Sequence, residues 1–182
     1  CRPLAARCDG GIGHEHPAIR AVIHQAASGG RISLMRIIIP TPVDQRLERH
    51  LLQVGERLAF LAAQLDGEAM SAVGLLPIGE DLLDAADLSH LALTDECRAM
   101  VIRWAHERSA ALVEVHSHPS WWPASMSIID IDGLAEWVPH VRWRLPGRPY
   151  AAIVVAGATL DALVWDGTGV SAPYNVERSG IA

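Results

Sequence analysis

Apolar residues recur along the chain at two spacings, which together predict an alternation of helices and strands. Over residues 43–54 they recur every three or four positions, as on the buried face of a helix, and the pattern stops at Gly55. Residues 94–108 repeat this spacing, and Thr94 stands where a helix cap belongs. A third, shorter helix is predicted over residues 127–138.

Short apolar runs of strand length lie between and after these helices. Two of them flank Asp66-Gly67, a dipeptide that favours a tight hairpin turn. Residues 79–92 are predicted to form a loop. The order of helices and strands is typical of a layered α/β or α+β fold. The predicted strands cover residues 35–39, 56–63, 69–78, 111–115, 151–155 and 160–165.

The chain of 182 residues is long enough for one sizeable hydrophobic core but short for two full domains. Residues 1–34 are rich in glycine and weakly periodic, so we expect a leader, a linker or a mis-assigned start outside the core. The domain itself is predicted over residues 35–166, and residues 167–182 are predicted to be a C-terminal tail.

Composition narrows the class of protein. The chain has 15 Lys and Arg against 21 Asp and Glu, and this formal charge of -6 disfavours nucleic acid as a partner. No apolar run reaches the roughly 18 residues of a membrane-spanning helix. The 3 cysteines do not resemble a disulfide framework, so we expect a cytoplasmic protein with no membrane partner. The 9 histidines make imidazole and carboxylate the expected ligands of any metal.

The residues most informative about chemistry directly follow a predicted strand. His116 and His118 are two positions apart, so on an extended chain their imidazoles project to the same face. Ser127 and Asp130 have the spacing of a helix cap with an acid at the third helical position. Two imidazoles and one carboxylate leave a tetrahedral zinc ion with one open position, which is the pattern of catalytic zinc.

Taken in order, His116-x-His118, a following proline and Ser127-x-x-Asp130 resemble the signature of the JAMM or MPN-plus (JAB domain) zinc metallopeptidases. The resemblance covers residues 35–165, including the order of helices and strands before the motif. It implies a three-layer α/β fold of the cytidine-deaminase-like kind, with a mixed curved sheet flanked by helices. It also implies one Zn²⁺ per chain, bound by His116, His118 and Asp130.

One departure from the family pattern concerns the carboxylate ligand. The family usually places the aspartate one residue nearer the second histidine than Asp130 lies from His118, and this chain has Ile129 there. Because the Ser-x-x-Asp spacing is intact, we interpret the difference as one extra residue in the loop around residues 121–123. Asp132 is a weaker alternative ligand.

The family's general acid/base is a glutamate at the start of an early strand, and Glu56 occupies that position. Glu68 and Glu80 fit less well because they lie in the turn and the loop that follow. The resemblance also implies that Ser127 donates a hydrogen bond to the developing oxyanion. Glu114 shares the face of the histidines, but the family pattern gives it no ligand role, and we interpret it as structural.

The implied substrate bond is a peptide or isopeptide bond after the C-terminal tail of a ubiquitin-like protein, cleaved in deconjugation or in precursor processing. The expected partners are that protein or its conjugates, together with activating or conjugating enzymes of the same operon, in a bacterial single-domain system. Trp121 and Trp122 either wall the substrate cleft or pack against the fold. A catalytically inactive MPN-type scaffold or binding module is the alternative function.

Overall fold

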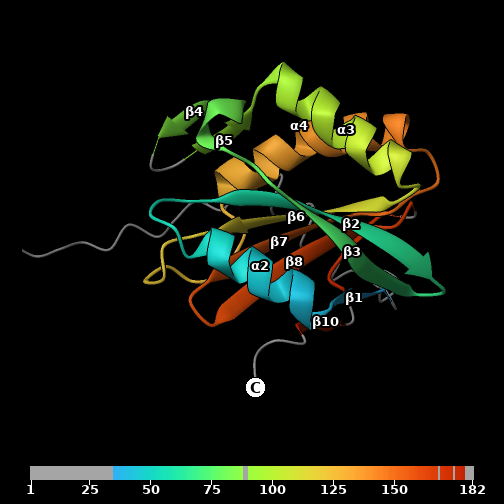
Figure 1. The fold of residues 1–182 in the computed structure, drawn as a ribbon, viewed down its shortest axis with the longest axis horizontal. Helices are drawn as coiled ribbons and strands as arrows, with labels where there is room; N and C mark the ends of the chain where they lie inside the picture. The colour runs from blue at the N-terminus through green and yellow to red at the C-terminus, as the bar shows by residue number, and fades with distance from the viewer. Residues whose placement is uncertain (1–34, 88–89, 168, 174, 179–182) are drawn as a thin grey trace, which may run out of the picture.

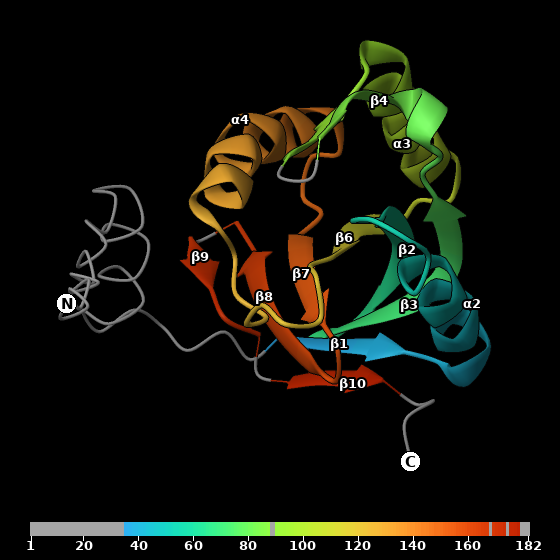
Figure 2. The same ribbon diagram turned by 90° about the vertical axis from the view of Figure 1, so that its left-hand side faces the viewer.

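A curled sheet of eight strands forms the middle of the protein, and helices cover both of its faces (Figures 1 and 2). The structure is a computed structural model that describes residues 35–87, 90–167, 169–173 and 175–178. Helix α2 lies against one face of the sheet, and helices α3 and α4 lie against the other. The predicted three-layer α/β class is therefore confirmed.

The strands follow the order β10-β1-β3-β2-β6-β7-β8-β9 across the sheet, which mixes parallel and antiparallel pairs. Strand β6 is antiparallel to β2 and parallel to β7, so it lies inside the sheet with a partner on each side. The strands are β1 (Arg36–Ile39), β2 (Leu58–Asp66), β3 (Ala69–Pro77), β6 (Ala111–Ser117), β7 (Tyr150–Ala156), β8 (Thr159–Trp165), β9 (Val170–Ser171) and β10 (Asn175–Arg178).

The hairpin predicted around Asp66-Gly67 is confirmed as the β2–β3 pair. Gly67 has a φ of 56°, a conformation that glycine adopts without a steric penalty. Ala62 pairs with Gly74 and Ala63 pairs with Ala72, so Val73 is an extra residue on β3, and this bulge bends the strand.

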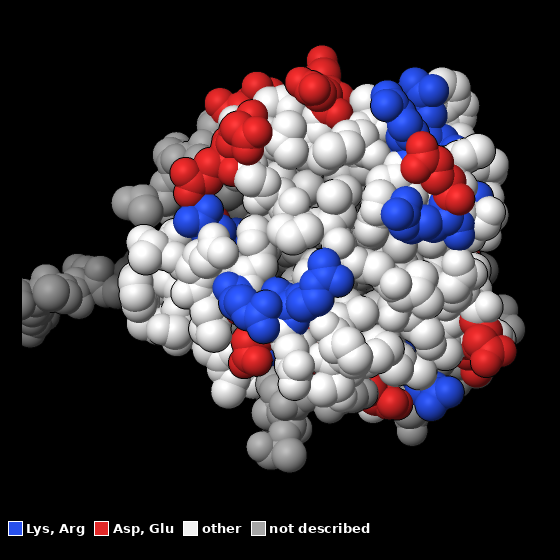
Figure 3. Space-filling model, viewed as in Figure 1, with Lys and Arg blue, Asp and Glu red and all other residues white. Residues whose placement is uncertain are grey.

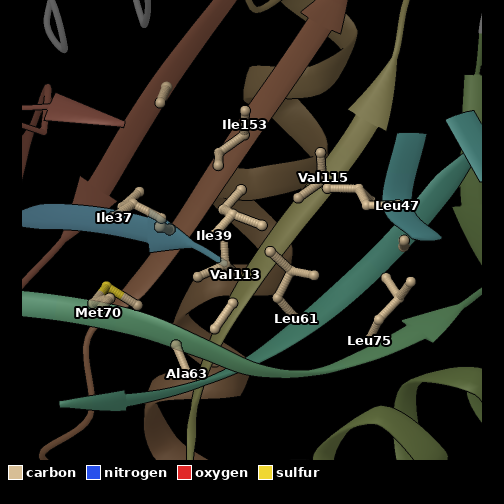
Figure 4. Close-up of a cluster of buried hydrophobic side chains, with 14 of the residues drawn as sticks. Ile37, Ile39, Leu47, Leu61, Ala63, Met70, Leu75, Val113, Val115 and Ile153 are labelled. Carbon is tan, nitrogen blue, oxygen red and sulfur yellow. The ribbon is translucent and has the colours of Figure 1, made fainter. Parts of the chain in front are cut away.

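Helix α2 (Thr41–Leu51) covers the first of two apolar clusters. It begins with proline in its first turn, where the fixed φ suits a helix and no backbone N–H is required. Its Leu47 lies beside Val115 of β6, and β1 contributes Ile37 and Ile39 to the same cluster (Figure 4). The cluster contains side chains from β1 and β7, which are not neighbours in the sheet. They share one core because the sheet curls around it.

Helices α3 (Asp95–Glu107) and α4 (Ile128–Arg144) cover the second apolar cluster, on the opposite face. Helix α3 begins as predicted, with the Thr94 hydroxyl accepting a hydrogen bond from the Cys97 backbone N–H. Cys97 is fully buried, and burial raises the pKa of its thiol to about 11, helped by the charge of Asp81. This cysteine is therefore a packing residue and not a reactive thiolate.

The prediction of a loop over residues 79–92 is wrong. This segment contains a short 3₁₀ helix, η1 (Glu80–Leu82), and a separate two-stranded sheet of β4 (Leu83–Asp87) and β5 (His90–Leu93). Strands of 5 and 4 residues have too few positions to show a clear alternation. They are stabilised by each other and by packing of Leu83 and Leu93 on the second cluster.

Helix α4 is longer than the predicted residues 127–138. It continues past Pro139 to Arg144, because Val141 and the following Leu145 are buried against the core. Their burial offsets the hydrogen bond that a proline removes from a helix interior.

The predicted boundary at residue 166 is also wrong, because the sheet extends beyond it. Strand β9 pairs with β8, and β10 pairs in parallel with β1. Both strands are too short and polar to be recognised from periodicity. The buried carboxylate of Asp44 accepts a hydrogen bond from Arg178 Nε at 2.7 Å, which ties β10 to α2.

Residues 1–34, for which we predicted a leader, linker or mis-assigned start, lie outside the described residues. None of the helices that the structure describes is both long and apolar enough to cross a membrane. On the face viewed in Figure 3, acidic side chains gather along the upper left edge and basic side chains form small clusters, without a broad basic surface.

Candidate metal centre

The end of β6 presents two buried imidazoles. His116 and His118 are 4% and 8% exposed, and their ring centroids lie 5.0 Å apart. His118 follows the last residue of β6, but its backbone N–H still donates to the Val155 carbonyl at 2.8 Å, which continues the pairing with β7. Strand geometry therefore places both rings on one face at the same edge of the core.

Asp130 is directed at these rings by the cap of α4. The Ser127 backbone N–H donates to Asp130 Oδ2 at 2.6 Å, and the Asp130 N–H donates to Ser127 Oγ at 3.2 Å. This reciprocal capping box orients the carboxylate at the first helical turn. Its Oδ1 lies 3.5 Å from His116 Nε2, and its Oδ2 lies 3.4 Å from His118 Nε2.

The spacing of these three side chains fits a metal ion. Ligand atoms of His116, His118 and Asp130 all lie within 4.8 Å of one another. Zinc–nitrogen bonds of about 2.0–2.1 Å would place tetrahedral ligand atoms roughly 3.3 Å apart, close to the nitrogen–oxygen distances above. His116 Nε2 is buried and has no hydrogen-bond partner within the part of the chain that is described, so it is an unsatisfied donor or ligand atom. This group could hold a metal ion.

The alternative ligand, Asp132, does not join the group. It lies exposed on α4, and the ligand atoms that converge come from Asp130 instead. Ile129, at the usual family position of the aspartate, is 42% exposed. The geometry therefore favours the interpretation of one extra loop residue.

The electrostatics of these three side chains favour cation binding. Burial alone would raise the pKa of Asp130, but His116 and the Ser127 hydrogen bonds lower it to about 2. Burial and neighbouring His116 lower the pKa of His118, so both side chains are in ligand form at neutral pH. Burial also acts to lower the pKa of His116, but Asp130, Glu114 and Glu56 outweigh it and raise the value, so a metal would displace a proton there.

Glu56 lies at the rim of this group. Strands β2 and β6 pair Leu58 with His116, and Arg57 and Ser117 continue the pairing by exchanging hydrogen bonds of 2.9 Å. This pairing places Glu56, the residue before Arg57, at the edge of the metal group. Glu56 lines a cavity of about 140 Å³ together with His116 and Asp130, and its charge contributes to the raised pKa of His116.

The other two glutamates considered for this role lie elsewhere. Glu80 Oε1 accepts from Arg57 Nη1 at 2.6 Å, in an ion pair that holds the chain entering β2. Glu68 is in the hairpin turn, at the opposite end of β2 from Leu58. Neither glutamate lines the cavity beside the metal group.

Both tryptophans of the motif loop are exposed, and neither lines the cavity. Trp121 is 81% exposed, whereas Trp122 is 45% exposed and meets the His118 ring edge-on at a centroid distance of 5.9 Å. Ile128 and Ile129 are also exposed, at the start of α4. Trp122 at the His118 ring and Ile129 at the cavity place exposed apolar side chains next to the candidate ligands.

A polar network of Glu114, Tyr150 and Trp137 lies next to His116 and could not be predicted from the sequence. The buried Tyr150 hydroxyl donates to Glu114 Oε2 and accepts from Trp137 Nε1 at 3.1 Å. Burial raises the pKa of Glu114, although His116 and Tyr150 partly oppose this. The alternation of Glu114 with His116 on β6 was the only sequence signal, because the other partners lie on β7 and α4.

Ser127→Ala is expected to lower the free energy of unfolding by about 0.5–2 kcal/mol, because it removes the side-chain cap of α4. The affinity of the group for a metal ion is expected to fall as well, since Asp130 loses part of its orientation. Thermal unfolding and zinc competition titration measure the two effects. Thr94→Ala removes the equivalent cap of α3 and should lower stability alone. An equal loss of affinity in both variants would contradict an orienting role for Ser127.

No protein-family model matches the chain, and no curated protein matches it. Among solved structures, it is similar to the solution structure of protein DSY2949 from Desulfitobacterium hafniense, with a TM-score of 0.54 and 14% sequence identity. The likeness covers 78% of this chain and 92% of that chain. At this level of identity the likeness shows a similar fold alone.

Proposed function

We propose that the protein is a zinc-dependent peptidase that cleaves the bond after the C-terminal tail of a ubiquitin-like protein. The observation that carries this proposal is the convergence of His116, His118 and Asp130 beside a cavity that Glu56 lines together with two of them, His116 and Asp130. Three ligands with a neighbouring carboxylate form the minimal set for metal-assisted hydrolysis. The resemblance of the motif to the JAMM metallopeptidases supplies the reaction class.

Each residue of the centre has a separate role in the proposed hydrolysis. Zinc bound by the three ligands would lower the pKa of a coordinated water and polarise the scissile carbonyl. Glu56 accepts the proton of the attacking water and delivers it to the departing amine. The Ser127 oxygen already accepts from the Asp130 N–H, so its own O–H is available to stabilise charge on the carbonyl oxygen.

A protein substrate is supported by the surface around the centre. The exposed side chains of Trp121, Trp122, Ile128 and Ile129 offer an apolar contact area beside the metal group. Exposed apolar patches of this kind commonly mark protein contacts. We therefore favour a polypeptide tail over a small-molecule amide as the substrate.

The test begins with zinc analysis of the full chain, followed by incubation with a ubiquitin-like protein that bears either a linear extension or a lysine-linked target. We expect one zinc ion at the centre and cleavage directly after the tail. A chelator should abolish cleavage and added zinc should restore it. Preference for the lysine-linked target indicates deconjugation, and preference for the linear extension indicates precursor processing.

A folded preparation that holds no zinc and cleaves neither substrate would contradict the proposal and favour the inactive scaffold. Genes adjacent to this one provide candidates for the substrate and for activating or conjugating partners.

A further inference from the structure

Glu114 lies against the side of the His116 ring that faces away from the candidate metal ligands. Its Oε1 is 3.8 Å from His116 Nδ1, whereas His116 Nε2 is 3.5 Å from Asp130 Oδ1. The imidazole thus lies between two carboxylates, with one within ion-pair distance of each ring nitrogen. Both side chains are largely removed from solvent, with exposures of 5% for His116 and 14% for Glu114.

Two buried side chains fix the position of Glu114 Oε2 through hydrogen bonds. Tyr150 donates its hydroxyl hydrogen to Glu114 Oε2, and Trp137 Nε1 donates to the Tyr150 oxygen at 3.1 Å. Tyr150 is fully buried and Trp137 is 6% exposed. Because Glu114 Oε2, the Tyr150 hydroxyl and Trp137 Nε1 are joined by hydrogen bonds, the carboxylate has little freedom to rotate away from the ring.

The relay also joins the two elements that supply the ligands. Strand β6 carries Glu114 and His116, while helix α4 carries Asp130 and, seven residues later, Trp137. Seven residues correspond to about two helical turns, so Asp130 and Trp137 lie on the same side of α4. Asp130, at one end of this helix face, lies next to His116. Trp137, at the other end, is connected to His116 through Tyr150 and Glu114.

A purely structural role does not account for this arrangement. An amide in place of Glu114 would satisfy Tyr150 equally well, because Tyr150 needs only an acceptor. A buried carboxylate is costly unless another group uses its charge. Here the group next to Glu114 Oε1 is Nδ1 of His116, a candidate metal ligand.

We propose that Glu114 is a positioning residue that holds the His116 imidazole with Nε2 toward the metal. Carboxylates that accept from the outer nitrogen of a ligating histidine fix its tautomer and orientation and raise its basicity. Tyr150 and Trp137 keep Glu114 in place. This inference rests on the metal centre of the proposed function, but it does not depend on the identity of the substrate.

The test compares zinc affinity across variants of the full chain by competition with a chromophoric chelator. Glu114→Gln is expected to weaken zinc binding about 10- to 100-fold, with little change in the melting temperature of the metal-free protein. Tyr150→Phe should cause a smaller loss, and the double variant should lose less than the two single losses combined, because Tyr150 acts through Glu114. Bound Co²⁺ should show an altered visible spectrum in Glu114→Gln.

Asp44→Asn is the matched control, because Asp44 is also a buried carboxylate with a fixed partner, but on α2 on the opposite face of the sheet. It should lower the melting temperature and leave zinc affinity unchanged. Wild-type affinity and an unaltered Co²⁺ spectrum in Glu114→Gln would overturn the inference while leaving the proposed function intact. If Glu114→Gln does not fold, unchanged affinity in Tyr150→Phe overturns it. A wild-type chain that binds no zinc overturns both proposals.

Discussion

Asp130→Asn is expected to remove zinc from the protein and hydrolysis with it. The amide keeps the size of the side chain and an oxygen that can accept from the Ser127 N–H, so the cap of α4 is largely preserved. It removes the negative charge that lies between the two imidazoles. Because loss of a partner of a ligand already costs about 10- to 100-fold in affinity, loss of the ligand itself should cost at least about 100-fold.

Zinc content after dialysis and competition titration measure this effect. Asp132→Asn is the matched control, since it makes the same change two residues away on the same helix at an exposed position. It should retain zinc and activity. The opposite result, with zinc kept by Asp130→Asn and lost by Asp132→Asn, would identify Asp132 as the ligand and contradict the geometry of the centre.

Glu56→Gln should have a different signature, with normal zinc content and a hydrolysis rate about 10²–10⁴-fold lower. That range is the usual contribution of general acid/base catalysis. The amide can still lie at the rim of the cavity, but it cannot accept a proton from water. The loss should appear mainly in kcat, because the tail-binding surface and the metal ligands are unchanged.

Glu68→Gln provides the comparison for Glu56→Gln. Glu68 is an exposed glutamate in the β2–β3 turn, remote from the cavity, so this variant should cleave at the wild-type rate. Full activity in Glu56→Gln would refute its assignment as the proton carrier. Loss of zinc in that variant would instead indicate that Glu56 supports the metal ligands.

The parts of the centre that sequence could predict are those set by short-range geometry. The positions of His116 and His118 follow from strand alternation, and Asp130 follows from a helix cap that spans only four residues. The pairing of β2 with β3 follows from the Asp66-Gly67 turn in the same way. Each of these features depends on neighbours in the chain, so its pattern is visible without knowledge of the fold.

Features set by distant contacts could not be predicted. The Glu114–Tyr150 hydrogen bond joins residues 36 positions apart on two different strands. Strands β4 and β5 are short and are stabilised by pairing with each other. Strand β10 is short as well and is stabilised by pairing with β1, which lies far from it in the sequence. The placement of Glu56 came only from the family resemblance, because nothing in its local sequence separates it from Glu68 or Glu80.

The pairing of β10 with β1 has a consequence for the order in which the chain can fold during synthesis. Strand β1 is made first among the described strands, yet one of its edges is completed only when β10 emerges, and the Asp44–Arg178 pair joins residues 134 positions apart. Until then the nascent domain exposes an unpaired strand edge, which can pair with other chains. In the complete sheet the edge strand is instead β10, which is short and carries the charged residues Glu177 and Arg178, features that disfavour pairing with other chains.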